Sequence, residues 1–272
     1  MPVLIPVLVL LAIGAVCALL LTLASVFFAV KEDERAMQIK DCLPGVNCGS
    51  CGFAGCEDYA KALSEGKVSE TNLCTPGGDG VARDIASILG VEAGEVVEMV
   101  AYVACNGDCK PEKRKYQYDG LKSCAAANMN YAGDNYCVFA CLGYGDCVNV
   151  CPRDAICINE RNIAVVDPRK CIGCGLCVKT CPRGIISLIR DTSRVTVKCS
   201  NHDKGVYVRK ACLNGCISCG KCEKTCRYDA IKVVDNLATI DYDKCTGCGE
   251  CRSVCPVKCI HGGNFICGAH FE

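Results

Sequence analysis

The spacing of the cysteines points most directly to the chemistry of this chain. Thirty of its 272 residues are cysteine, and the pattern C-x2-C-x2-C-x3-C-P occurs twice, at 171–182 and at 245–256. In runs of this kind, three thiolates bind one [4Fe–4S] cluster, while the fourth binds a second cluster nearby. The pattern therefore predicts a protein that carries electrons through clusters held by cysteine.

Exchange of the fourth cysteine between two runs predicts the ligand sets. In the second half of the chain it gives two complete sets, although Arg227 replaces the proline expected after Cys226. In the first half the opening run is altered, because Tyr144 aligns with the ligand Cys219, and we expect Cys137 to supply the missing thiolate. The four predicted sets are Cys216, Cys219, Cys222 and Cys255; Cys245, Cys248, Cys251 and Cys226; Cys171, Cys174, Cys177 and Cys151; and Cys137, Cys141, Cys147 and Cys181.

A further set lies nearer the N-terminus, where three glycines separate the first three of four cysteines. Glycine lets the backbone approach a cluster closely and direct its N–H groups at the sulfides. The alternative is a glycine-rich turn with incidental cysteines. The predicted ligands are Cys48, Cys51, Cys56 and Cys74.

The remaining cysteines leave the number of clusters open. Several of them could build one more cluster, or they could be buried thiols. The cofactor prediction is therefore at least five [4Fe–4S] clusters. The candidates for a sixth are Cys105, Cys109, Cys124, Cys199 and Cys212.

Other uses of cysteine fit the spacing less well. Disulfide scaffolds do not favour these repeated runs, and structural zinc usually takes two separated pairs. The sequence has no G-x-G-x-x-G after a strand, no P-loop and no H-E-x-x-H, so we expect no flavin, no NAD and no catalytic residue on this chain. Thirty Lys and Arg balance thirty Asp and Glu, which gives no indication of nucleic-acid binding.

An internal duplication indicates the elements that position the cysteines. Residues 153–186 align with 227–260, and each copy has a short apolar strand, a polar turn, a second strand and a cysteine run. Each unit should be a small β-hairpin with two short helices around two clusters. The predicted fold class is α+β, with one N-terminal transmembrane helix, a small helical [4Fe–4S] module and two bacterial-ferredoxin-like units.

The cysteine pattern also predicts the domain boundaries. Inside the helical module we expect helices near 80–89 and 92–103, and in the second linker an exposed basic turn that could meet an acidic donor (Lys198, Lys204, Arg209 and Lys210). The expected divisions are a membrane helix at 1–30, a charged helical linker at 31–41, the helical module at 42–103, a cysteine-containing connector at 104–136, unit one at 137–190, a linker at 191–211, and unit two at 212–272.

Residues 2–30 carry no charged side chain, and a helix of this length exceeds the roughly 30 Å hydrocarbon core of a membrane. A signal peptide would have a basic start and a shorter apolar region. Lys31, Arg35 and Lys40 follow the apolar run, and no basic residue precedes it. The positive-inside rule therefore predicts a single-pass protein of the cell membrane, in contact with lipid, whose cluster domains lie in the cytoplasm.

Three features carry a resemblance to a known family: the uncharged helix, the cysteine repeats, and the segment LPGVNCGSCGFAGC at 43–56 followed by Cys74. The chain resembles the B component of the Rnf-type ion-translocating ferredoxin:NAD oxidoreductase complex. The resemblance covers nearly the whole chain, with Tyr144 and Arg227 as departures. It implies an electron-transfer subunit that accepts electrons from soluble ferredoxin. It also implies partners, namely the membrane iron–sulfur, flavin-carrying and NAD-binding subunits, and coupling to Na⁺ or H⁺ translocation.

Two other functions remain open from the sequence. One is an electron-transfer subunit of another membrane oxidoreductase, hydrogenase-like or quinone-linked. The other is a cluster protein that acts as a sensor. A sensor needs an output module, and no DNA-binding helix pair or basic stripe is present in the sequence.

Overall fold

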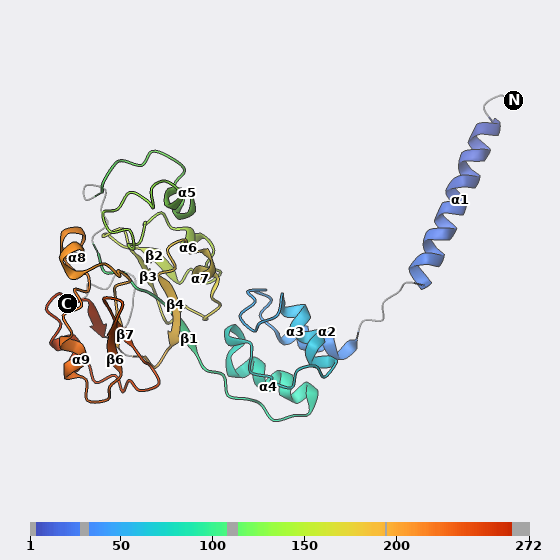
Figure 1. Ribbon diagram of the computed structural model, residues 1–272. Helices are drawn as coiled ribbons and strands as arrows, with labels where there is room; N and C mark the ends of the chain where they lie inside the picture. The colour runs from blue at the N-terminus through green and yellow to red at the C-terminus, as the bar shows by residue number, and fades with distance from the viewer. Residues whose placement is uncertain (1–3, 28–32, 108–113, 194, 263–272) are drawn as a thin grey trace.

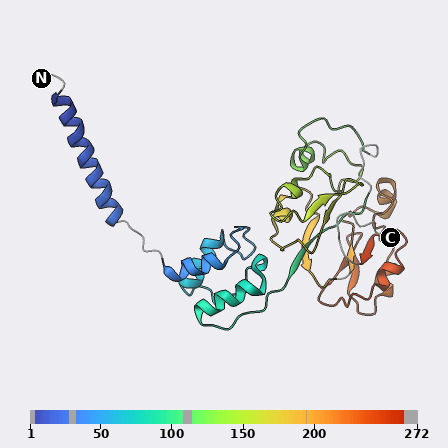
Figure 2. The same ribbon diagram turned by 180° about the vertical axis from the view of Figure 1, so that it is seen from behind.

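The structure, a computed structural model, describes residues 4–27, 33–107, 114–193 and 195–262 (Figure 1). Cys109 and residues 263–272 lie outside this part of the chain. From the N-terminus, a separate helix is followed by a small helical module and then by a larger body that holds both cysteine-rich repeats (Figures 1 and 2). The fold is thus α+β.

Most elements after the first helix are short, because loops that carry cysteines separate them. The helices are α1 (Leu4–Phe27), α2 (Glu34–Cys42), α3 (Cys56–Ser64), η1 (Thr75–Gly77), α4 (Gly78–Leu89), α5 (Cys124–Met129), α6 (Asp146–Asn149), α7 (Leu176–Thr180), α8 (Gly205–Ala211), α9 (Lys221–Thr225) and α10 (Glu250–Ser253). The strands are β1 (Met99–Val103), β2 (Ile156–Ile158), β3 (Ala164–Val166), β4 (Ile186–Arg190), β5 (Val195–Val197), β6 (Ile231–Val234), β7 (Leu237–Ile240) and β8 (Ile260–Gly262).

Helix α1 is a candidate membrane span. Its stretch Val7–Ser25 is long and apolar enough to cross a membrane, and none of that stretch is covered by the rest of the protein. The 24 residues of the helix, at about 1.5 Å each, exceed the roughly 30 Å of a hydrocarbon core.

The helical module is built from α2, α3 and α4. Ile39, Tyr59 and Ile85, one from each helix, are 0% exposed and pack in one core. We expected residues 31–41 to form a helical linker, and from Glu34 onward they do form a helix. That helix is part of the module, because its only fully buried side chain, Ile39, packs against α3 and α4.

The helix expected near 80–89 is present as α4, whereas the one expected near 92–103 is wrong. Residues 99–103 form β1, which pairs antiparallel with β4 and places Val100 opposite Ile189. Val100, Ala101 and Val103 are at most 3% exposed, so both faces of the strand are covered. A strand buried on both faces has a continuous apolar run, which periodicity alone does not separate from a helix.

The duplication extends further than the sequence alignment. The expected hairpins are β2–β3 and β6–β7, each flanked by two short helices. In addition, a strand that precedes each unit pairs antiparallel with the strand that follows its last cysteine run, β1 with β4 and β5 with β8. Each repeat is therefore closed by a strand from the segment before it.

Candidate iron–sulfur sites

The first site lies in the helical module. Asn47 Oδ1 accepts the backbone N–H of Cys56 at 2.8 Å, which fixes the glycine-rich loop against the start of α3. Burial raises the pKa of Cys74 to about 11, so a thiolate at this position needs a cation beside it. The four predicted ligands line one cavity and form site 1: Cys48, Cys51, Cys56 and Cys74.

Three more predicted sets come together around the two hairpins. In each set, three cysteines of one run lie close enough to a fourth from another run for their charges to interact. Burial raises the pKa of Cys177 to about 12 and that of Cys222 to about 11. These sets are site 2, with Cys151, Cys171, Cys174 and Cys177; site 5, with Cys216, Cys219, Cys222 and Cys255; and site 6, with Cys226, Cys245, Cys248 and Cys251.

The altered run of the first unit differs from the expected ligand set. Cys124, from the connector, lines its cavity, and Cys137 does not. Of the neighbouring thiols, Cys124 and Cys181 have the largest electrostatic effect on Cys147. Burial raises the pKa of both Cys141 and Cys147 to about 12. The four cysteines around this cavity are Cys124, Cys141, Cys147 and Cys181, which we call site 3.

Asp146 holds Cys124 in place. Its carboxylate accepts the N–H groups of Cys124 and Ala125 and the hydroxyl of Ser123, each at 2.9 Å, and so caps the first turn of α5. Burial by itself would raise the pKa of Asp146, but these hydrogen bonds outweigh it and lower the pKa below its ordinary value. A charged Asp146 therefore fixes the connector thiol beside the first unit.

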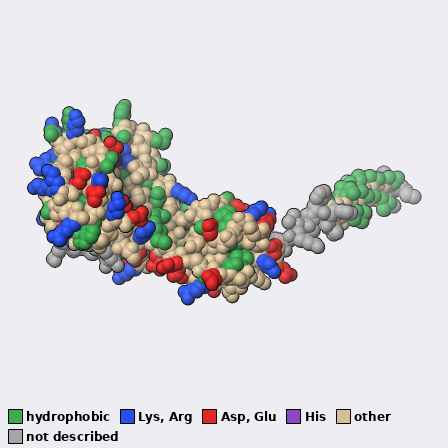
Figure 3. All heavy atoms as spheres, turned by 60° about the horizontal axis from the view of Figure 1, so that its bottom comes forward, with side chains coloured by type: hydrophobic (Ala, Val, Ile, Leu, Met, Phe, Trp, Pro, Cys, Tyr) green, Lys and Arg blue, Asp and Glu red, His purple; other side chains and the backbone are tan. Residues whose placement is uncertain are grey.

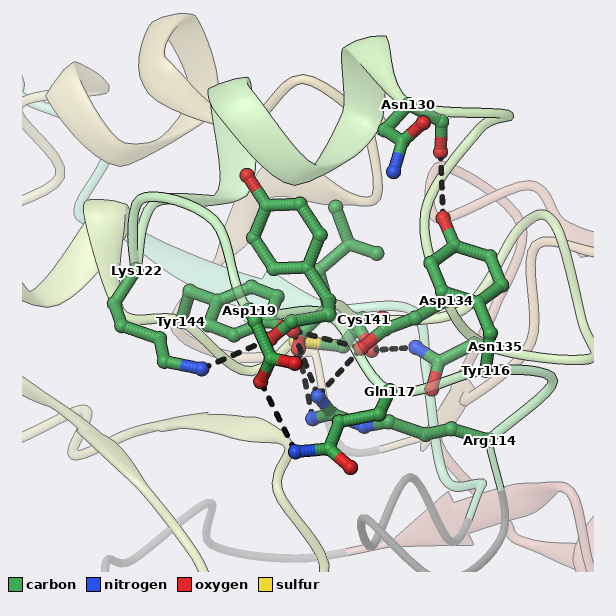
Figure 4. A network of polar contacts seen from close by, with 12 residues as sticks. Arg114, Tyr116, Gln117, Asp119, Lys122, Asn130, Asp134, Asn135, Cys141 and Tyr144 are labelled. Atoms are coloured by element: carbon green, nitrogen blue, oxygen red, sulfur yellow. Dashed lines mark hydrogen bonds and ion pairs between the residues drawn. The ribbon is translucent and has the colours of Figure 1, made fainter.

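A buried ionic network anchors the rest of the connector (Figure 4). Arg114 Nη1 lies 2.6 Å from Asp134 Oδ2 and donates to the Tyr144 hydroxyl at 2.8 Å. Tyr144 in turn donates to Asp134 Oδ2 at 2.7 Å. The side-chain amide of Asn135 donates to the carbonyl oxygen of Cys141 at 2.8 Å. Tyr144 aligns with a predicted ligand of the second unit. Here it helps to hold the connector, the segment from which Cys124 reaches the cavity of site 3.

A further cavity lies between the two units. Asn201 Nδ2 donates to Cys137 Sγ at 3.3 Å, and the backbone N–H of Cys216 donates to Cys199 Sγ at 3.3 Å. Four of the cysteines that the sequence left unassigned, or assigned elsewhere, line this cavity. They are Cys105, Cys137, Cys199 and Cys212, which we call site 4.

Lys198 also lines site 4, which corrects the expectation that it belongs to an exposed basic turn. Its ammonium lies 5.6 Å from the centre of the Tyr102 ring. Burial lowers its pKa to about 7, and the neighbouring Cys105 opposes that shift. Lys204, Arg209 and Lys210 are exposed, as expected, but the expected turn is wrong: Arg209 and Lys210 lie in helix α8, and Lys204 directly precedes it.

The surroundings of these thiols suit [4Fe–4S] clusters. Backbone N–H groups donate to ligand sulfurs, from Ala155 to Cys151 at 3.3 Å and from Ala230 to Cys226 at 3.4 Å, as outer hydrogen bonds to clusters do. Within the described residues, no three His, Cys, Asp or Glu side chains converge closely enough to share one metal ion.

One thiol beside site 5 was not singled out by sequence. Cys259 is 2% exposed, and its sulfur lies 3.7 Å from that of Cys255. Its thiol also interacts with that of Cys216, and these interactions with Cys259 lower the pKa of both Cys216 and Cys255. The alignment gave no signal for this role, because the equivalent residue in the first unit is Ile185.

Three segments of the chain match known iron–sulfur families. Residues 43–76 match a family described as "Putative Fe-S cluster", residues 211–261 match a 4Fe-4S dicluster domain, and residues 164–187 match a 4Fe-4S binding domain. The matched part of the first unit excludes its altered opening run, where Tyr144 lies.

The relatives extend over nearly the whole chain. The B component of the Na(+)-translocating ferredoxin:NAD(+) oxidoreductase complex of Acetobacterium woodii is 43% identical over 260 residues, 96% of this chain and 78% of that protein. The B component of the proton-translocating ferredoxin:NAD(+) oxidoreductase complex of Clostridium ljungdahlii is 42% identical over 91% of this chain and 88% of that protein. The B component of the ion-translocating oxidoreductase complex of Methanosarcina acetivorans is 39% identical over 93% and 95%. At these identities and coverages, the chain belongs to the B-component family of ion-translocating ferredoxin:NAD(+) oxidoreductase complexes, the family that its motifs resemble.

Proposed function

We propose that this chain takes electrons from reduced ferredoxin and relays them to membrane and NAD-reactive partner subunits of an ion-translocating complex. The observation that carries this proposal is the series of four-cysteine sites. The elements that hold these sites extend from the end of the molecule that bears α8 and α9 to the helical module that follows α1 in the chain (Figure 1). [4Fe–4S] clusters supply one-electron chemistry, and at all-thiolate sites they reach the low potentials that a ferredoxin donor requires.

Six clusters are proposed, one at each site. This assignment replaces Cys137 by Cys124 at site 3 and moves Cys137 to site 4. Cys109 is then not needed as a ligand. The shared cavities and the hydrogen bonds to Cys137 and Cys199 support the assignment.

Contacts between neighbouring sites support an order. Site 4 receives thiols from the connector, from unit one and from the segment before unit two, so it lies where the two units meet. Lys179 of α7 donates to the carbonyl oxygen of Cys48 at 2.6 Å, a contact that supports electron transfer between unit one and the helical module. Electrostatic interactions link consecutive sites from 1 to 4, between Cys48 and Cys174, between Cys177 and Cys147, and between Cys105 and Cys141. The hydrogen bond from the backbone N–H of Cys216 to Cys199 Sγ links site 4 to site 5.

The orientation in the membrane completes the proposal. Site 1 is nearest to α1 in sequence, since 17 residues separate Val30 from Cys48, and we assign it the transfer of electrons to the membrane subunits. The basic residues that follow α1 favour a cytoplasmic position for all six sites. A soluble donor would then meet the far end of the molecule.

The test uses the full chain in detergent, prepared without oxygen and with its clusters reconstituted. Reduced ferredoxin and NADH are added separately, and the visible cluster absorbance is followed. We expect ferredoxin to bleach the absorbance rapidly and NADH alone to leave it unchanged. If dithionite bleaches the sample but ferredoxin does not, the chain has another donor and the proposal is refuted.

A further inference from the structure

The cluster sites differ in how near their ligands come to solvent. Of the predicted ligands within the described residues, only Cys219 and Cys248 are exposed, and both belong to the second unit. All others are buried or half-buried. Electron transfer between proteins requires close approach, so the second unit offers the most accessible entry to the series.

Helix α8 lies directly against the loop that carries Cys219. A side chain at Gly205 would come within 2.6 Å of the carbonyl oxygen of Ile217, and one at Gly215 would come within 2.4 Å of Val208. These two glycines therefore allow the helix to contact the loop backbone. Val208 is 0% exposed, and it holds the inner side of the helix.

The outer side of α8 combines exposed apolar and basic residues. Val206, Tyr207 and Leu213 are 69%, 61% and 82% exposed. Lys204, Arg209 and Lys210 lie in the same segment of the chain and are exposed as well. We call these six residues the α8 face. Exposed apolar groups within a charged rim are characteristic of protein interaction sites.

Charge is distributed unevenly along the molecule. Over residues 33–98, twelve Asp and Glu face five Lys and Arg, whereas over 198–258 eleven Lys and Arg face seven Asp and Glu. Figure 3 shows the basic side chains gathered at the end away from α1 and acidic ones over the helical module. An acidic protein would be drawn to the basic end and repelled from the module.

We propose that the α8 face is the docking site of a soluble acidic electron carrier, the ferredoxin of the proposed function on which this inference rests. The basic rim steers the carrier to the surface, and the apolar residues make the close contact beside Cys219. One electron passes from the reduced carrier, which is oxidised, to the second unit, which is reduced, and no proton or bond is exchanged.

The experiment measures how fast reduced ferredoxin bleaches the full chain, by stopped flow at several salt concentrations. In the test variant, Lys204, Arg209 and Lys210 are changed together to glutamate. The matched control changes Lys61, Lys67 and Arg83, on the helical module, to glutamate, so the net charge falls by six in both variants. Iron content and dithionite-reduced spectra verify that both variants are loaded.

We expect the bimolecular rate of the α8 variant to fall roughly tenfold or more at low salt, with the difference shrinking as salt rises. The control should keep the wild-type rate within about twofold. Leu213→Ser should slow reduction at high salt too, because it removes contact and leaves charge unchanged.

Three results would overturn the inference. The α8 variant could react at the wild-type rate, the control could slow equally, or Leu213→Ser could have no effect at any salt concentration. If ferredoxin fails to reduce even the wild-type chain, which dithionite still reduces, the proposed function falls and this inference with it. If ferredoxin reduces the wild type and the α8 variant equally fast, the docking proposal is refuted and the proposed function stands.

Discussion

Replacing Arg114 by methionine should loosen the connector that carries Cys124. The side chains of Arg114 and Asp134 are 10% and 0% exposed, and their closest atoms lie 2.6 Å apart. Loss of one partner of a buried ion pair costs about 3–5 kcal/mol, because the other charge stays buried. Tyr144 still donates to Asp134, so we expect the lower end, about 3 kcal/mol.

Hydrogen exchange of the amides in 115–136 measures this local opening in the loaded chain. A loss of about 3 kcal/mol raises the open population, and with it the exchange rate, roughly a hundredfold. Arg169→Met is the matched control: this side chain is 71% exposed and pairs with Asp167, so its loss costs at most about 1 kcal/mol. If the two variants exchange alike in this segment, the network does not anchor the connector.

Three other variants test the sites. Cys124→Ser and Cys137→Ser should each remove about four irons but abolish different electron paramagnetic resonance signals, and loss of the same signal would contradict the reassigned ligands. Cys259→Ala removes a hydrogen bond to Cys255 and should lower the reduction potential of one cluster by up to about 40 mV, the equivalent of about 1 kcal/mol. Redox titration measures this potential, and an unchanged value would exclude that hydrogen bond. Asp146→Asn removes charged hydrogen bonds and should lower the local stability of α5 by about 1.5–3 kcal/mol, so hydrogen exchange at α5 should become faster. The fold lowers the pKa of Asp146, so its contribution to stability should be complete at a pH above about 3.9, its pKa in the unfolded chain. That contribution should be lost only as the pH falls below this value. A loss near neutral pH would contradict the role of a charged Asp146.

The sequence predicts the ligands that lie within one cysteine run, since short spacing brings them together whatever the rest of the chain does. The fourth cysteines that lie beside the runs of sites 2, 5 and 6 also follow from the repeat. Cys124 could not be predicted at the cavity of site 3, because it comes from a connector without periodicity. It is placed by Asp146 and by the buried pair of Arg114 and Asp134, contacts between residues 20 or more positions apart.

Two local patterns were misleading for physical reasons. The apolar segment at 92–103 suits a helix by composition, yet its backbone pairs with β4, 83 residues further on at Val103 and Ile186. Lys198 looked like part of an exposed basic turn, but it follows β5, whose three residues are all buried, and it continues into the wall of site 4. In both cases, residues distant in the sequence determine the environment, whereas local propensity reflects only the neighbouring residues.

The strands that close the two repeats make this chain difficult to divide. A fragment that starts at residue 137 leaves β4 with an open edge, and one that starts at 212 does the same to β8 while removing thiols of site 4. Open edges favour aggregation. During synthesis, β1 emerges more than eighty residues before β4, so it waits without its partner until unit one is complete. Assembly of the electron pathway is therefore a property of the whole chain, and unit one cannot close before its last cysteine run has been made.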